Sequence, residues 1–91
     1  MFVTLNGHRY GIVYADLGDD DGLCDPPGKR HKKITINKRV LPYDQQHMDA
    51  LLHEMQHGAM WWLDEEYVEG YATAAARVLY RVGFRRAAPM Q

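Results

Sequence analysis

The sequence changes character near Pro42, and this change constrains the fold more than any other feature. Before Pro42, β-branched and aromatic residues alternate with turn formers, which is typical of strands and hairpins. After it, apolar residues recur at helical spacing. Strands followed by helices predict an α+β fold, with a small antiparallel or mixed sheet packed on a two-helix hairpin. A chain of 91 residues suits one domain, so we expect residues 1–91 to form a single unit.

The first half predicts about three strands. Asn6-Gly7 lies between two apolar segments and is a strong signal for a type I′ hairpin turn. Further on, alternating polar and apolar residues favour a strand with Ile34 and Ile36 facing the core. The expected strands span residues 2–5, 10–14 and 33–37, and a polar loop is expected over 16–33.

The second half predicts two helices. Asp44 is expected to cap the first helix, which runs to about Leu63 and carries apolar residues on two sides, as a helix between two layers does. Asp64 is expected to cap the second helix, Gly83 to end it, and residues 84–91 to form a flexible tail. The apolar stripes are Met48, Leu51, Leu52, Met55, Ala59 and Trp62 on the first helix, and Val68, Tyr71, Ala72, Ala75, Val78, Leu79 and Val82 on the second.

Composition excludes several classes of protein. A net charge of −1 lacks the electrostatic footprint of a dedicated nucleic-acid binder, and the basic run 29–33 lies beside an acidic cluster that neutralises it. No apolar stretch is long enough to span a membrane. The single cysteine, Cys24, excludes an internal disulfide framework. Without a signal-peptide pattern at the N-terminus, we expect a cytoplasmic location.

The segment His53-Glu54-Met55-Gln56-His57 is an HExxH motif inside the first expected helix. Residues four apart share one helix face, so His53 and His57 can bind one metal ion. Glu54 lies about 100° round the helix, where it can contact a water on that metal and act as a general base. Two structural histidines are the alternative, but the central position of the motif in an independently predicted helix favours a metal site.

A catalytic zinc requires a third protein ligand, and the next helix offers Glu65, Glu66 and Glu69. If the first helix runs to Leu63, Glu69 returns to the level of His57, which favours Glu69. An earlier end to the first helix would favour Glu65 or Glu66, whose position in the first turn is also explained by the helix dipole alone.

A family resemblance now becomes usable. HExxH followed by Glu69, with a small residue three positions later, resembles the gluzincin branch of zinc metallopeptidases. Residues 22–83 more closely resemble small SprT-like or phage-encoded metallopeptidases. The chain departs from larger gluzincins because only eleven residues separate His57 from Glu69 and it has no C-terminal subdomain. The resemblance rests on the runs Gly22-Leu23-Cys24-Asp25, Lys33-Ile34-Thr35-Ile36, Leu51-Leu52-His53-Glu54 and Leu63-Asp64-Glu65-Glu66-Tyr67-Val68-Glu69.

This resemblance implies a minimal zincin that hydrolyses peptides or proteins in the cytoplasm of a bacterium or a phage-infected cell. It implies Zn²⁺ held by His53, His57 and Glu69, with Glu54 as the base. It also suggests that the strand over 33–37 offers an edge to an extended peptide. Candidates for an additional oxyanion partner are Tyr71, Tyr67, Tyr43 and His47.

Other interpretations remain open from the sequence. The chain can instead be a non-catalytic binding module stapled by a structural zinc, since a small core gains stability from a metal. Trp61 and Trp62 can line a substrate pocket, although helical spacing assigns Trp62 to the core first. Cys24 is an extra ligand or, more simply, an incidental loop residue. Substrate specificity and oligomeric state are not specified by any motif.

Overall fold

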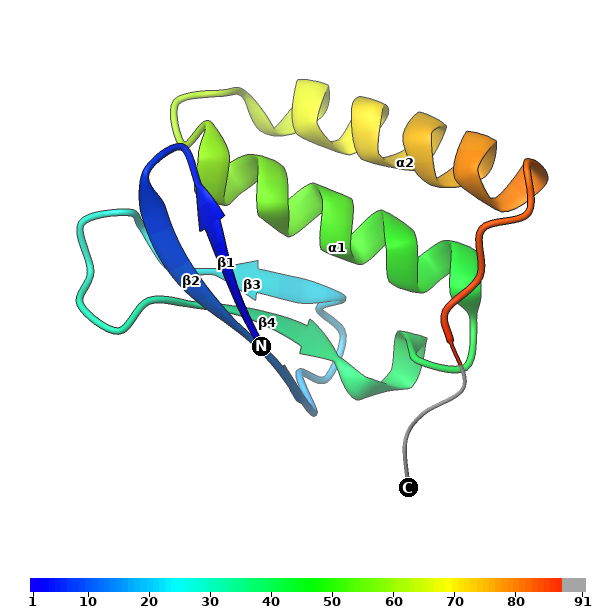
Figure 1. Ribbon diagram of the computed structural model, residues 1–91, viewed down its shortest axis with the longest axis horizontal. Helices are drawn as coiled ribbons and strands as arrows, with labels where there is room; N and C mark the ends of the chain where they lie inside the picture. Colours follow the sequence, from blue (N-terminus) through cyan, green and yellow to red (C-terminus); the bar gives the residue numbers. More distant parts are fainter. Residues whose placement is uncertain (88–91) are drawn as a thin grey trace.

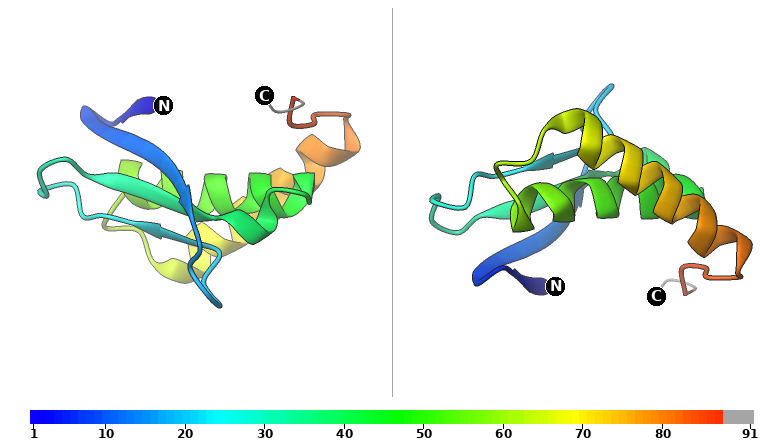
Figure 2. Two further views of the ribbon diagram at one scale, coloured as in Figure 1. Left: turned by 90° about the horizontal axis from the view of Figure 1, so that it is seen from below. Right: turned by 90° about the horizontal axis from the view of Figure 1, so that it is seen from above.

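The computed structural model of the protein describes residues 1–87 and has an α+β fold in three layers (Figure 1). A four-stranded sheet forms one layer, helix α1 (Asp44–Ala59) packs on it, and helix α2 (Glu65–Arg81) packs on the opposite side of α1. Figure 2 shows the sheet nearest the viewer from below and α2 nearest from above. The predicted fold class and the sandwiched position of the first helix are therefore confirmed.

The sheet is mixed and has the strand order β1-β2-β4-β3. Strands β1 (Phe2–Leu5) and β2 (His8–Ala15) form an antiparallel hairpin. Both turn residues have positive φ, 50° at Asn6 and 83° at Gly7, as a type I′ turn requires, so the predicted hairpin is confirmed. Strand β4 (Lys33–Asn37) then pairs parallel with β2.

Strand β3 (Gly22–Cys24) was not expected, because it lies inside the segment interpreted as a polar loop. It pairs antiparallel with β4, so that β4 lies inside the sheet and β3 is an edge strand. The expectation that residues 33–37 form a free edge is therefore wrong. Three residues carry too little periodicity to identify a strand, and only the pairing with β4 makes this segment one.

The main core lies between the sheet and α1. Ile34 and Ile36 are fully buried there, as predicted. Gly58 lets the end of α1 approach the hairpin closely, because a Cβ at this position would lie 3.0 Å from Leu5 Cδ1 and 3.1 Å from Tyr10 Cε2. A short 3₁₀ helix, Lys38–Val40, leads from β4 towards α1 and contributes Val40 to the core. The buried cluster consists of Tyr10, Ile12, Ile34, Ile36, Val40 and Ala50.

Both helices differ in detail from expectation. Helix α1 ends at Ala59, before Leu63, so Trp62 lies beyond it and is 72% exposed instead of in the core. Asp44 is the first helical residue, and Tyr43 occupies the N-cap position. Because α2 is covered by α1 alone, only a narrow strip of it is buried, and much of the expected stripe is exposed. The buried residues are Val68, Ala72 and Ala76, and the exposed ones of the expected stripe are Tyr71, Val78 and Val82.

The segment after α2 turns back towards the start of α1 (Figure 1). Residues 84–87 form neither helix nor strand, and the backbone N–H of Arg86 donates to the carboxylate of Asp44 at 3.3 Å. The rest of the expected tail, residues 88–91, lies outside the described residues. Within residues 1–87, neither helix has the length and apolarity needed to cross a membrane.

Candidate metal centre

The two histidines of the HExxH motif and one glutamate converge at the end of α1. His53 Nε2 lies 2.6 Å from Glu65 Oε1, and His57 Nε2 lies 2.7 Å from Glu65 Oε2. The imidazole rings meet edge to face with their centroids 4.9 Å apart. One donor atom from each of the three side chains lies within 4.8 Å of the other two. The expected pairing of His53 with His57 on one helix face is therefore what the structure shows.

The chain reversal between the helices brings Glu65 to this position. Helix α1 ends at Ala59, and the backbone N–H of Leu63 donates to the carbonyl of Met60 at 2.9 Å, which tightens the turn. Asp64 then occupies the N-cap position of α2, as expected, although its side chain makes no capping hydrogen bond, and Glu65 is the first helical residue. The first turn of α2 therefore lies beside the last turn of α1, which carries His57.

Glu69, which helix geometry favoured as the third ligand, does not join this group. The argument for Glu69 assumed that α1 continues to Leu63, and α1 ends four residues earlier, at Ala59. The return of the chain is displaced accordingly, and Glu65, one of the two alternatives, faces the histidines instead. Glu69 lies one turn further along α2, beside a cavity that His53 and Glu54 also line.

Glu54 points from α1 towards the edge strand β3 and is only 7% exposed. It passes so close to Gly22 that a Cβ on that residue would lie 2.8 Å from Glu54 Cγ and 3.0 Å from Oε2. Burial raises the pKa of Glu54 from 4.5 to about 7, against the opposing effect of His53. A carboxyl group whose pKa lies near neutrality can both accept and return a proton, which suits a general acid–base role.

Two cavities meet at Glu54. One, of about 410 Å³, is bounded by Leu23 and Cys24 of β3, by His57 and Glu65, and by Trp61 and Leu63 of the helix connection. The other, of about 270 Å³, lies on the His53 side, between the start of β3 and the two helices. It is bounded by Asp21, which precedes β3, by Gly22 of β3, by Gln46, Asp49 and Ala50 of α1, and by Glu69 and Thr73 of α2. A bound peptide that passes Glu54 can therefore place its side chains in the cavities on both sides of this residue.

The tyrosine candidates lie elsewhere. Tyr71 lines a groove on the helix pair with Leu52 and Val78. Tyr43 lies at the opposite end of α1, and Tyr67 is 61% exposed in α2 and lines neither cavity. His47 is buried, and its Nε2 lies 2.9 Å from the hydroxyl of Tyr14, so it takes part in packing α1 on the sheet. The structure brings none of the four proposed oxyanion partners into the cavities beside Glu54.

Two other sequence candidates do line the larger cavity. The ring of Trp61 meets that of His57 edge to face, with centroids 6.3 Å apart. Cys24 is half-buried, and burial raises its pKa to about 11, so its thiol is neutral at pH 7 and is a poor metal ligand in that form. Trp61 is thus a pocket residue, and Cys24 forms part of the wall.

Sequence reasoning from periodicity missed the contribution of β3. Gly22 and Leu23 entered as site residues only through the family resemblance, and Cys24 was otherwise considered as an extra ligand, although together they supply the wall opposite the HExxH motif. A glycine followed by two apolar residues was the one available signal, and dense turn formers on both sides hid it. Asp21 and Asp49 carried no local signal of a site either, because only the tertiary fold brings them to one cavity.

The donor set at the helix junction fits a zinc ion. Two imidazole nitrogens and one carboxylate are the donor types that catalytic zinc sites use, and three such donors would leave a coordination position for substrate or water. The side chain of Glu65 is 62% exposed and can adjust to an ion, whereas the histidine side chains, about one-fifth exposed, are held by packing. No family model matches the chain, and neither the curated proteins nor the solved structures compared with it gave a match.

Proposed function

We propose that the protein is a zinc-dependent metallopeptidase. The observation that carries the proposal is the convergence of His53, His57 and Glu65 beside the buried carboxyl group of Glu54, where two cavities meet. This combination supplies three ligands for a metal and a separate group for proton transfer. A purely structural site would need the ligands but would not need the carboxyl group of Glu54, which packs against Gly22.

In this proposal each side chain has a distinct task. His53, His57 and Glu65 hold the ion, which supplies Lewis acidity for activating a water and polarising a peptide carbonyl. Glu54 accepts the proton of the attacking water and returns it to the nitrogen of the leaving amine. Leu23 and Trp61 form apolar walls beside the reacting bond.

The edge strand β3 provides a path for the substrate. One side of β3 has no strand partner in the described sheet, so its backbone groups can pair with an extended peptide. Such a peptide runs along Gly22–Cys24 and passes Glu54, with side chains entering the cavities on either side. We propose the cytoplasm of a bacterium or a phage-infected cell as the location, as the resemblance to small SprT-like or phage-encoded metallopeptidases implies.

The test combines metal analysis with peptide hydrolysis. We expect about one zinc per chain by elemental mass spectrometry, loss of zinc in His53→Ala, and weakened zinc binding in Glu65→Gln. Glu69→Gln is the matched control, because it removes the same charge one helix turn away and should keep its zinc. Glu54→Gln should keep zinc and lose the hydrolysis of unstructured proteins and peptide mixtures that the wild type shows.

Two results would overturn parts of this proposal. A folded wild type that takes up no zinc, even when zinc is added, would remove the metal site. Full zinc occupancy without hydrolysis of any peptide in a diverse mixture would favour the alternative, a binding module stapled by a structural zinc. Retained hydrolysis in Glu54→Gln would remove Glu54 from the reaction.

A further inference from the structure

The smaller cavity beside Glu54 is lined by acidic side chains from three parts of the chain. Asp21 comes from the loop that leads into β3, Asp49 from α1 and Glu69 from α2. His53 and Glu54 form its wall on the side of the candidate metal centre, so the cavity borders the proposed active site. At about 270 Å³ it falls below the roughly 300–1,000 Å³ of pockets for drug-sized ligands and suits a single side chain.

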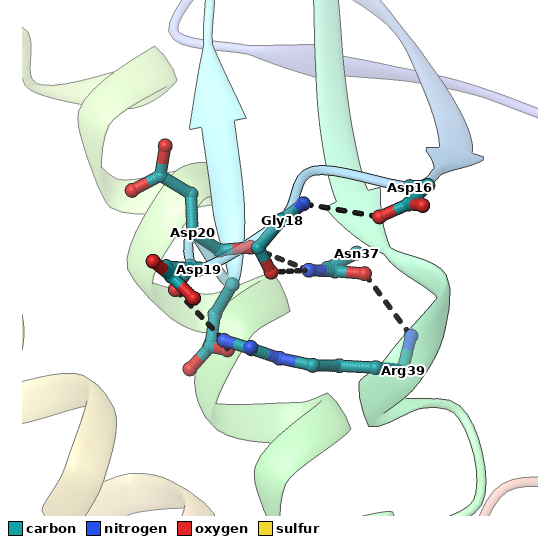
Figure 3. Close-up of polar contacts among 7 residues, drawn as sticks. Asp16, Gly18, Asp19, Asp20, Asn37 and Arg39 are labelled. Carbon is teal, nitrogen blue, oxygen red and sulfur yellow. Dashed lines mark hydrogen bonds and ion pairs between the residues drawn. The ribbon is translucent and has the colours of Figure 1, made fainter.

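Of these three carboxylates, only that of Asp21 has a cationic partner within residues 1–87. Asp21 pairs with Arg39 at 2.7 Å, and Arg39 also donates to the carbonyl of Asp19 at 2.8 Å (Figure 3). Asp49 accepts a hydrogen bond from the neutral hydroxyl of Thr73 at 3.1 Å. Glu69 is exposed, and its side chain makes no hydrogen bond or ion pair with another described residue. No lysine or arginine is among the residues that line the cavity.

The acidic loop that supplies Asp21 is held in place and is not simply a solvated turn. The side-chain amide of Asn37, which is buried, donates to the carbonyls of Gly18 at 3.0 Å and Asp20 at 2.8 Å (Figure 3). The backbone N–H of Asn37 also donates to the carbonyl of Asp21 at 2.8 Å. These bonds fix the backbone of residues 18–21 against β4, so the carboxylate of Asp21 starts from a defined position at the cavity.

The position of Glu54 also points to a cationic occupant. Glu54 is more than nine-tenths buried and lines this cavity, and its side chain makes no hydrogen bond or ion pair with any other described residue. Its carboxylate oxygens keep some solvent contact, so a donor that enters the cavity can reach them and replace water as their partner. The carboxylates do not converge on one point as metal ligands do, since His53, His57 and Glu65 form the metal-binding group found among residues 1–87. Spread-out acceptors match a long side chain with several N–H donors better than a single ion.

We propose that this cavity is a specificity subsite, which binds a lysine or arginine side chain of the substrate next to the bond that is cleaved. The inference rests on the proposed peptidase function and names its substrate class. The peptide backbone lies along β3, the basic side chain enters between Asp49 and Glu69, and its charged end faces the carboxylates. The larger cavity, walled by Leu23, Trp61 and Leu63, takes an apolar side chain on the other side of the bond.

The experiment uses peptides that differ at one position beside the cleavage site, which carries lysine, arginine, norleucine or glutamate. Norleucine keeps the length of the lysine side chain without its charge. For the zinc-loaded wild type we expect kcat/KM to be about tenfold higher for lysine and arginine than for norleucine, a ratio worth about 1.4 kcal/mol, and lowest for glutamate. Asp49→Asn and Glu69→Gln should each reduce the ratio several-fold, and Glu66→Gln, an exposed charge in the first turn of α2, should not.

Binding to the inactive Glu54→Gln variant separates failure of the subsite from failure of the peptidase, and the same peptides are measured by fluorescence anisotropy. Cleavage without any preference for lysine or arginine would overturn the subsite and leave the peptidase in place. Preferential binding of basic peptides that Asp49→Asn weakens, in the absence of any cleavage, would support the subsite on a non-catalytic module. Neither cleavage nor charge-dependent binding would overturn both proposals.

Discussion

Replacing Glu54 by glutamine should stabilise the metal-free protein as the pH rises. The substitution keeps the size of the side chain and removes its charge, in a position that is 7% exposed. Burial, with the nearby charges of Glu65 and Asp20, raises the pKa of Glu54 from 4.5 to about 7, although His53 opposes this. Between these two pH values the folded state holds a proton that the unfolded chain has released, so the stability of the wild type falls as the pH rises.

The size of this effect follows from the shift in pKa. At 1.36 kcal/mol per pH unit, a rise from 4.5 to about 7 corresponds to roughly 3 kcal/mol of lost stability once Glu54 is fully ionised. Glu54→Gln does not carry this cost. The two proteins should therefore have similar stability near pH 4, and the variant should be more stable by roughly 3 kcal/mol above pH 8.

Urea unfolding with a chelator present, followed through the fluorescence of Trp61 and Trp62, measures this difference at each pH. Only the difference between the two proteins is interpreted, because other groups titrate in both. Glu66→Gln is the control, since Glu66 is exposed in the first turn of α2, and its difference from the wild type should stay near zero. A difference between Glu54→Gln and the wild type that does not change with pH, or a wild type that is the more stable protein at pH 8, would refute the argument that burial controls this carboxyl group.

Three further substitutions test the packing around α1. Gly22→Ala should reduce hydrolysis by about 100-fold and keep zinc, because a Cβ 2.8 Å from Glu54 Cγ displaces the carboxyl group; equal kcat in both proteins would contradict this. Gly58→Ala should cost about 1–3 kcal/mol in urea unfolding, since its Cβ would lie 3.1 Å from Tyr10 Cε2, and a more stable variant would show that the sheet yields. Burial lowers the pKa of His47 below 6.5, so its contribution to stability is present above that pH and is lost as the pH falls. His47→Gln should therefore reduce the loss of unfolding free energy below pH 6.5. An equal loss in both proteins would assign it to other groups.

The parts of the fold that sequence predicts best are those encoded by neighbouring residues. The Asn6-Gly7 turn defines the first hairpin locally, and the alternation around Ile34 and Ile36 defines both the strand and its buried face. The position of Asp64 before a helix that starts with two glutamates is a similar local signal. These elements were predicted because their own residues suffice to specify them.

The parts that were missed depend on contacts between distant segments. Strand β3 exists because Gly22–Cys24 pair with β4, and nothing in three residues announces this. The end of α1 was placed too late because residues 60–63 contain two tryptophans and a leucine, which continue an apolar helical pattern. The chain instead turns at Met60, whose N–H still donates to the carbonyl of Gln56 at 2.7 Å. This difference decides which glutamate meets the histidines.

The exchange of Glu69 for Glu65 also explains how one helix face can serve two purposes. Residues four apart lie on the same side of a helix, and each step of four advances about 6 Å along its axis. Glu65 therefore meets His53 and His57 at the start of α2, while Glu69 and Thr73, on the same face, follow along the acidic cavity. The argument for Glu69 used the helical rise to match a residue of α2 with the level of His57. It could not fix where along α1 that face begins, because the turn before α2 sets that distance, and so the residue first assigned to the metal belongs to the neighbouring cavity.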